Sequence, residues 1–531
     1  MAGSADLIRI GTGAVGDDDL NCPSFTGVKV RPQIRPRTRV NSLRPRLETF
    51  ALDPVMTALN RFELDHWDLD KALAEIGTAG KPCHPGTVTF ARHAVRSYLD
   101  AAASTATVLT PVRDWWVVQK AQTRTWELYA WGRRYQSADG RHRELRLLRF
   151  GDASSRPRDL TQVAIAAFSA AFGAPAPWPD PWSTRFQTGA HQNIDHVRIV
   201  DVGLLDGSEV VRFDGTPADA ETFFASHGRT QIQRIAEGGP AHPGSSCPEC
   251  KQLTSCTTLP RIPGVLGLPA KRAPQRVVSA SDLRYYRTCP AQAHLRSVHL
   301  PRDGEYSDEA VLGQAVHAWL ENLHTSGAPC DRDAMPTGDE PWSAGRWTVS
   351  GEHARIGAQM LRHHPDVCAL RHNDTVTEVR IEPRLTVHDT AAHAVVIAKP
   401  DMLYLDDGAW VWREVKTTQK RRWFHTDLLD EFPQLALAVS FLAEGVLGGD
   451  TTSSRIELEV LRPTGPDIDW IDPTDPERVA KARTVLRELA QPWRDDETFD
   501  ARPGRNCRWC PVSRWCPSFP GPGPSSEGDD L

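Results

Sequence analysis

Two sets of cysteines with the same spacing constrain the fold of this chain more than any other feature. The pattern C-x2-C-x5-C occurs twice, and a lone cysteine followed by proline lies far upstream of each occurrence. The first set is Cys22, Cys247, Cys250 and Cys256, and the second is Cys289, Cys507, Cys510 and Cys516. Clustered cysteines in a chain without an export signal are more often metal ligands than disulfides. Because each set spans about half of the chain, we expect two modules, each closed by its own cluster.

Composition places the chain among ordinary globular proteins. Apolar residues make up 40% and charged residues 24% of the 531 residues, which excludes collagen-like, disordered and coiled-coil classes. The net charge of −6 gives no global attraction to nucleic acid, so such binding must come from local patches. No apolar run is long enough for a membrane span, and the N-terminus lacks a basic start followed by an apolar core. We expect a cytoplasmic protein without a membrane partner.

The order of predicted elements indicates an α/β fold with a mixed central sheet flanked by helices. In the second half, helices are predicted over 279–288, 308–324 and 427–447, and strands over 376–387, 394–405, 409–416 and 455–463. The proline- and glycine-rich stretch 257–275 is the predicted linker. We therefore divide the chain into 1–256, 257–275, 276–520 and a disordered acidic tail, 521–531.

One hairpin carries the residues most typical of a catalytic metal site. Asp401 begins a predicted strand, and the turn at 406–408 returns the chain along a second strand that carries Glu414 and Lys416. Residues two apart on a strand share a face, so an antiparallel hairpin can place Asp401 beside Glu414. Two such carboxylates form a hard-oxygen site for Mg²⁺ or Mn²⁺, and the lysine can orient an attacking water. The alternative is an exposed strand with alternating charges.

Two further residues accompany this hairpin. His317 follows Gly313 on an otherwise apolar predicted helix, where a histidine is either a core residue or a metal ligand. Gln434 lies on the helix after the second strand, within reach of the lysine or a phosphate.

The order G-x-x-x-H, P-D, E-x-K and then Gln resembles the PD-(D/E)XK nuclease superfamily, and in particular its RecB-like branch. The resemblance covers about residues 276–520 and implies a restriction-endonuclease-like core and a Mg²⁺- or Mn²⁺-dependent deoxyribonuclease. It implies that the metal ligands are His317, Asp401, Glu414 and the Val415 carbonyl. The implied catalytic residues are Asp401, Glu414, Lys416 and Gln434.

This chain departs from the family pattern at two positions. The glycine common three residues before the aspartate is Ala398, and the tyrosine common four residues after the glutamine is Ala438. Neither position carries the metal, so the departures concern substrate fit.

The cysteine set of the second half resembles that of AddB-type nucleases, which implies a [4Fe–4S] cluster on Cys289, Cys507, Cys510 and Cys516. A zinc site with four cysteines is the alternative, because spacing does not distinguish the two. The remaining cysteines Cys83, Cys330 and Cys368 fit neither set and are predicted to be ordinary thiols.

The first half is predicted to be a diverged nuclease-like copy with a second cluster on Cys22, Cys247, Cys250 and Cys256. In this interpretation Asp201 corresponds to Asp401, but no lysine follows an acid at the required spacing, so the copy is inactive. An unrelated domain with a zinc knuckle is the alternative. Candidate DNA-contacting arginines are Arg35, Arg37, Arg39, Arg421 and Arg422.

The family resemblance implies a nuclease that acts on single-stranded DNA or DNA ends, in recombination, repair or anti-phage defence, beside a helicase or another subunit. The alternative is a non-catalytic DNA-binding scaffold subunit of a helicase–nuclease complex, with an iron–sulfur or zinc site.

Overall fold

The computed structural model describes residues 1–15, 22–38, 40–103, 109–303, 307–372, 375–420 and 427–521. The chain forms two compact units. Unit 1 comprises Met1–Thr258, Thr288–Asp303 and Glu497–Leu531, and unit 2 comprises Leu259–Arg287 and Gly304–Asp496. Both cysteine sets therefore belong to unit 1, and the Asp401 hairpin belongs to unit 2.

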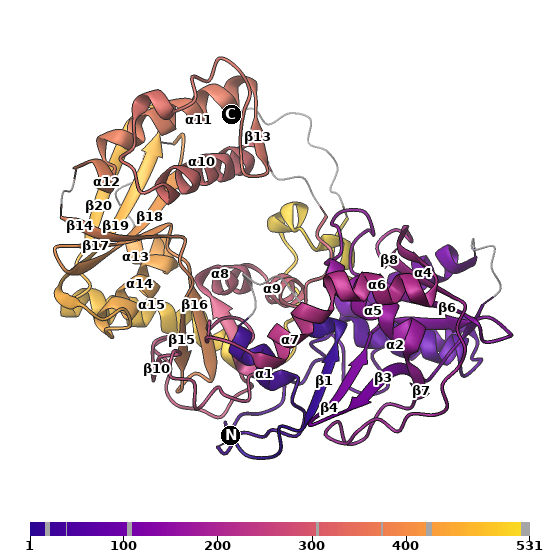
Figure 1. Cartoon of the computed structure of the whole chain (residues 1–531). Coiled ribbons are helices and arrows are strands. Elements are labelled where there is room, and N and C mark those ends of the chain that lie inside the picture. The colour runs from indigo at the N-terminus through magenta and orange to yellow at the C-terminus, as the bar shows by residue number, and fades with distance from the viewer. Residues whose placement is uncertain are drawn as a thin grey trace. The chain divides into compact units, whose positions relative to one another are not determined.

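A five-stranded mixed sheet forms the centre of unit 2 (Figure 1). All neighbouring strands are antiparallel except the parallel pair β18 and β19. In spatial order the strands are β14 (Val376–Ile381), β17 (Met402–Asp406), β18 (Ala409–Thr417), β19 (Asp450–Arg462) and β20 (Gly465–Ile471). The first seven residues of β18 are buried, as expected for a central strand covered on both faces.

Helices cover both faces of this sheet. On one face Val415 joins the apolar cluster of α10 and α11, and on the other the Trp412 ring meets Phe441 of α14 edge-on at 6.0 Å. The helices are α10 (Asp308–Thr325), α11 (Gly351–His363), α13 (Leu428–Glu431), α14 (Pro433–Ala443) and α15 (Pro476–Asp495). The helix predicted over 427–447 is two helices, because Pro433 has no N–H to continue the first and starts the second instead.

Unit 2 contains two smaller sheets. One has the order β10-β15-β16-β11, and the other is the hairpin of β12 and β13. The strands are β10 (Arg261–Ile262), β11 (Arg276–Ser279), β12 (Trp342–Ala344), β13 (Trp347–Val349), β15 (Leu385–Asp389) and β16 (Ala394–Ala398). The predicted linker 257–275 contributes β10 and buries Val265 and Leu266, so this stretch is packed structure.

The central sheet of unit 1 has the same strand order and the same strand directions as that of unit 2. Its pairs run antiparallel, antiparallel, parallel and antiparallel from β2 to β9. In spatial order the strands are β2 (Thr110–Pro111), β5 (Arg133–Gln136), β6 (His142–Arg149), β8 (His196–Gly203) and β9 (Glu209–Gly215). A helix, α5 (Leu160–Phe172), connects the parallel pair, as α13 and α14 do in unit 2.

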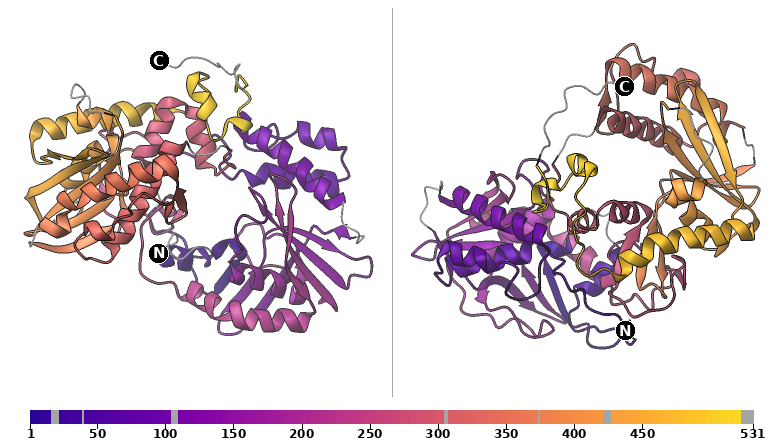
Figure 2. Two further views of the ribbon diagram at one scale, coloured as in Figure 1. Left: turned by 90° about the horizontal axis from the view of Figure 1, so that it is seen from above. Right: turned by 180° about the vertical axis from the view of Figure 1, so that it is seen from behind.

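Helices also cover both faces of the unit 1 sheet (Figure 2). Leu145 and Leu147 pack with α5, whereas Tyr135 and Leu148 pack with α2 (Leu52–Glu63) and α4 (Pro85–Ala103). A second sheet has the order β1-β4-β3-β7, with β1 (Leu7–Gly11), β3 (Trp115–Ala121), β4 (Thr125–Tyr129) and β7 (Ala174–Ala176). The remaining helices are α1 (Pro23–Lys29), α3 (Leu69–Ala74), α6 (Pro217–His227), α7 (Arg229–Glu237), α8 (Ala280–Thr288), α9 (Pro290–Ser297) and α12 (Ala369–His372). The predicted α/β class with mixed sheets flanked by helices is confirmed.

Two predictions about the whole chain concern membrane-spanning helices and the C-terminal tail. Among the described helices, none has the length and apolar character needed to cross a membrane. The predicted disordered tail lies outside the described residues from position 522 onward.

Candidate active site

A two-residue turn places Asp401 beside Glu414. Asp407 and Gly408 form the loop between β17 and β18, and both have positive φ, at 48° and 82°. Asp-Gly is typical of the turn type that matches the twist of a hairpin. Met402 pairs with Arg413 in the resulting register, and one further step brings Asp401 opposite Glu414.

Four side chains meet at this end of the hairpin. Asp401 accepts a hydrogen bond from the Val415 backbone N–H through Oδ2 at 2.7 Å, and its Oδ1 lies 3.2 Å from Nδ1 of His317. Lys416 Nζ lies 3.3 Å from Glu414 Oε2 and 3.8 Å from Asp401 Oδ2, and it donates to the Val415 carbonyl at 2.8 Å. The ammonium group therefore lies between the two carboxylates.

Helix α10 brings His317 to the hairpin. The helix starts at Ser307, whose side chain accepts from the Ala310 N–H and caps the first turn. A side chain at Gly313, one turn before the histidine, would place its Cβ 3.1 Å from Oγ1 of Thr417. Glycine thus allows the helix to pass close to the end of β18.

The electrostatics of the two carboxyl groups differ. Burial opposes ionisation of Asp401, but His317 and Lys416 outweigh it and lower its pKa to about 2. Burial, and then the charge of Asp401, raise the pKa of Glu414 to about 7. For His317, burial lowers the pKa, and the nearby Asp401 more than offsets this, so the pKa is raised. The site therefore holds a buried acid that a further cation would ionise.

The donor set fits a divalent metal ion of the hard class. Two carboxylates, an imidazole and a backbone carbonyl lie close together here, and His317, Asp401 and Val415 also line a small pocket. Oxygen-rich sets of this kind suit Mg²⁺ and Mn²⁺. Trp412 Nε1 donates to Glu414 Oε1 at 3.0 Å and orients that carboxylate.

Other predicted site residues are not joined to this group. Gln434 lies in the first turn of α14, and no hydrogen bond within the described part of the chain links it to Lys416. Arg35 donates to the Pro32 carbonyl and Arg37 to the Met1 carbonyl, although both are exposed. Of the other arginines predicted to contact DNA, Arg39, Arg421 and Arg422 lie outside the described residues.

The four cysteines of the second set line one hollow of unit 1. Cys289 begins α9, and the other three lie on the C-terminal turns. The sulfur of Cys507 accepts from the Gly504 N–H at 3.3 Å, and that of Cys289 from the Arg502 N–H at 3.4 Å. Backbone N–H groups directed at sulfur are typical of metal-bound thiolates.

The first set repeats this local structure. Cys22 begins α1 just as Cys289 begins α9, each with proline as the first helical residue. Cys247 accepts from the Gly244 N–H at 3.2 Å, the same offset of three residues found at Cys507. Burial, together with the neighbouring Cys250, Cys22 and Cys256, raises the pKa of Cys247 to about 11.

A third group of possible metal ligands is separate from both cysteine sets. Among the described residues, one group of three or more His, Cys, Asp or Glu side chains has all its ligand atoms within 4.8 Å of one another, and it belongs to neither set. A tetrahedral zinc site with Zn–S bonds of about 2.3 Å has sulfur–sulfur edges of about 3.8 Å.

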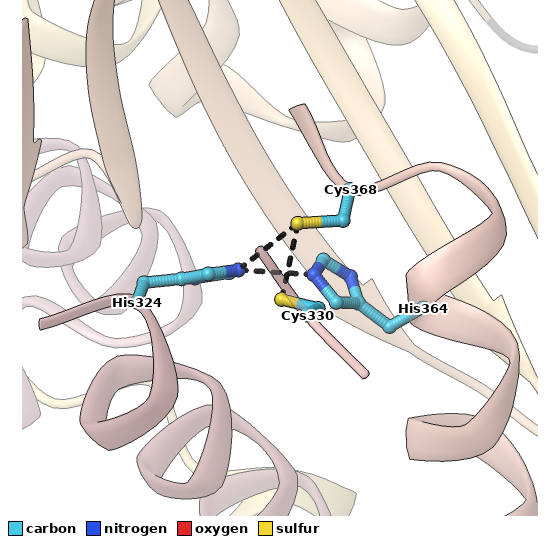
Figure 3. A group of neighbouring side chains, drawn as sticks. All are labelled: His324, Cys330, His364 and Cys368. Carbon is cyan, nitrogen blue, oxygen red and sulfur yellow. Dashed lines mark hydrogen bonds between the residues drawn. The ribbon is translucent and has the colours of Figure 1, made fainter. Parts of the chain in front are cut away.

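The compact group consists of His324, Cys330, His364 and Cys368, all buried in unit 2 (Figure 3). Cys330 and Cys368, which the sequence predicts to be ordinary thiols, instead lie beside two histidines. The signal in the sequence is His-x5-Cys followed by His-x3-Cys, which is irregular and easily missed.

The position of the Asp401 hairpin in unit 1 carries no acidic pair. There Arg133 pairs with Arg146, so the next step places Gly132 opposite Leu147. Gly132, Leu147 and Arg149 therefore occupy the positions of Asp401, Glu414 and Lys416. The prediction that Asp201 corresponds to Asp401 is wrong, because Asp201 lies on β8, the counterpart of β19.

Comparison with known proteins identifies the class. Residues 277–517 match the model of the PD-(D/E)XK nuclease superfamily. Among solved structures, the crystal structure of SSO0001 matches at 12% identity with a TM-score of 0.23, covering 46% of this chain and 86% of that one. No curated protein matches.

The mixed sheet flanked by helices, with two acids and a lysine on its central hairpin, is the architecture of a nuclease fold. Residues 277–517 form a PD-(D/E)XK nuclease superfamily domain. This superfamily indicates a metal-dependent nuclease.

Proposed function

We propose that this protein is a Mg²⁺- or Mn²⁺-dependent deoxyribonuclease whose active site is built from Asp401, Glu414 and Lys416. The observation that carries the proposal is the convergence of these three residues with His317 at one end of a buried hairpin. A surface pattern of alternating charges would leave them exposed, whereas the Glu414 side chain is 7% exposed.

Each residue has a role that follows from its position. Asp401, Glu414, His317 and the Val415 carbonyl would hold the divalent ion, which when bound supplies an activated water for attack on a phosphodiester. Asp401 is kept ionised by its neighbours, and its bond to the Val415 N–H fixes its orientation. Lys416 carries the positive charge that stabilises charge developing on the phosphate.

We further propose that both cysteine sets hold [4Fe–4S] clusters, in the manner of RecB-like nucleases of the AddB type. Two observations support this: the four cysteines of the second set line one hollow, and backbone N–H groups are directed at sulfur in both sets. The clusters would be structural and would link segments of unit 1 that lie far apart in sequence.

Unit 1 would then be an inactive copy of the nuclease fold that binds DNA or a partner. Its sheet has the same topology, but Gly132 and Leu147 replace the two acids. We expect a cytoplasmic enzyme acting on single strands or DNA ends, beside a helicase or another subunit in recombination, repair or anti-phage defence.

The nuclease proposal is tested with anaerobically purified protein, labelled single- and double-stranded DNA, and Mg²⁺ or Mn²⁺. We expect the wild type to cleave and Lys416→Ala to lose cleavage by about 100-fold or more. Lys481→Ala is the matched control, because Lys481 is exposed and pairs with Asp430 on the surface. Equal cleavage by wild type and Lys416→Ala would refute this active site. No cleavage by any of the three proteins would favour a DNA-binding scaffold.

The cluster proposal is tested by iron and sulfide content. Two [4Fe–4S] clusters hold about eight irons per chain, and Cys250→Ser or Cys510→Ser should each remove about four. Cys83→Ser is the control, because Cys83 belongs to neither set. Zinc in place of iron in wild-type protein would overturn the proposal.

A further inference from the structure

The buried group His324, Cys330, His364 and Cys368 has the composition and spacing of a single-ion metal site. Nε2 of His324 lies 3.0 Å from Nε2 of His364, and the sulfurs of Cys330 and Cys368 are 3.0 Å apart. Cys368 Sγ lies 3.9 Å from His324 Nε2, and all four ligand atoms lie within 4.8 Å of one another (Figure 3). A zinc tetrahedron of this composition has edges of about 3.3 to 3.8 Å.

The histidines present the correct atoms to the centre. His364 Nδ1 lies 2.6 Å from Oε1 of Glu459, a carboxylate on β19 that is fully buried. A carboxylate only accepts, so Nδ1 of His364 carries a proton, and Nε2 faces the centre, where the neutral form of the ring would offer its lone pair to a metal ion. A carboxylate behind a histidine ligand is the usual support of a zinc site.

Arg413 holds Glu459 in turn, with Nη1 3.3 Å from Oε2. The supporting carboxylate is therefore itself oriented from the central sheet. His324 and His364 are both at most 5% exposed, so solvent has little access to their rings.

We propose that this group binds one Zn²⁺ with two thiolate and two imidazole ligands, as a structural site distinct from the nuclease centre. Thiolate and imidazole donors select zinc over the Mg²⁺ or Mn²⁺ expected at Asp401. The ligand atoms are too close together for a two-iron cluster, which separates its cysteine and histidine ligands onto different irons.

The site brings together the end of α10, the loop that follows it, and the segment between α11 and α12. His324 ends α10, Cys330 lies in the loop that follows, His364 begins the turn after α11, and Cys368 precedes α12. His324 lies two turns beyond His317 on α10. The ion would fix the C-terminal end of the helix that positions the candidate metal ligand.

The first experiment measures zinc in the full chain, purified anaerobically with reductant. We expect one Zn²⁺ per chain beyond any zinc in the cysteine sets, with an X-ray absorption shell of two sulfurs at about 2.3 Å and two nitrogens at about 2.0 Å. An all-sulfur shell, a Cys330–Cys368 disulfide found by mass spectrometry, or free thiols without zinc would each overturn the proposal.

Variants locate the ion. Cys330→Ser with Cys368→Ser should remove this zinc and leave the iron content unchanged, whereas Cys83→Ser should change neither. If the double variant does not fold, Glu459→Gln keeps all four ligands and should weaken zinc affinity about 10- to 100-fold in competition with a chelator. Glu378→Gln, an exposed acid, is its control. Unchanged affinity in Glu459→Gln would refute the supporting role of Glu459. None of these measurements depends on nuclease activity.

Discussion

Asp201 lies at the centre of a buried ion cluster in unit 1, and replacing it by asparagine should destabilise that unit strongly. Its Oδ2 accepts from Nε of Arg149 at 3.0 Å and from Nε of Arg212 at 2.7 Å, and Arg158 donates to Oδ1. The aspartate side chain is 0% exposed. It therefore balances three guanidinium groups from a fully buried position.

The size of the effect follows from charge, because asparagine has nearly the same shape and leaves no cavity. Removing one partner of a buried ion pair costs about 3–5 kcal/mol, since the opposite charges stay buried without compensation. The three arginines are 14–18% exposed and keep some hydration. We therefore expect about 3 kcal/mol for Asp201→Asn.

Asp195→Asn is the matched control. Asp195 pairs with Arg141 at 2.8 Å, but both side chains are more than half exposed, so losing this ion pair should change the stability of unit 1 very little.

Hydrogen exchange by mass spectrometry gives the opening free energy of unit 1 from peptides that cover β6 and β8. A change in Asp201→Asn no larger than that in Asp195→Asn would refute the reasoning. An effect removed by high salt would also contradict it, because a buried cluster is screened little.

Two further predictions concern unit 2. Gly357→Ala should destabilise unit 2 by about 1–3 kcal/mol, although alanine has the better helix propensity. The new Cβ would lie 2.6 Å from the ring of Trp342, and this ring is held in place by its hydrogen bond to the Ala354 carbonyl. Urea unfolding that shows equal or greater stability of the variant would contradict this prediction. Burial lowers the pKa of His388 to about 4, so the unfolded state binds a proton first as the pH falls from about 6.5, and stability is lost between about pH 6.5 and 4. The loss in unfolding free energy through His388 is about 3 kcal/mol. In urea unfolding, His388→Gln should therefore lose less stability than wild type between about pH 7 and pH 4.5. Parallel pH profiles of stability for the two proteins would refute the role given to His388.

The candidate active site could be predicted because it depends on short-range geometry. The Asp407-Gly408 turn sets the hairpin register, and register places Asp401 opposite Glu414. Likewise the helix predicted over 279–288 is observed as α8, Ala280–Thr288, because the Ser279 side chain caps its first turn by accepting from the Asp282 N–H.

Contacts between distant segments could not be predicted in this way. The sequence suggested that Asp201 corresponds to Asp401, but strand pairing places it on β8 among arginines. The stretch 257–275 is rich in proline and glycine, yet it packs because Asp389 accepts from the N–H groups of Gly264 and Leu266. The proline and glycine content of a stretch indicates only its local flexibility. It does not indicate whether a residue more than a hundred positions away will hydrogen-bond to that stretch.

The α/β class, the hairpin acids with their lysine, and the two repeated cysteine patterns follow from the sequence, because turns, strand period and ligand spacing are local. The tertiary structure alone decided that both cysteine sets lie in unit 1 and that His324, Cys330, His364 and Cys368 meet. This is because α10 and α11 come together through apolar packing, which depends on the whole core. Such packing brings the four ligands together without imposing a regular spacing on them in the sequence.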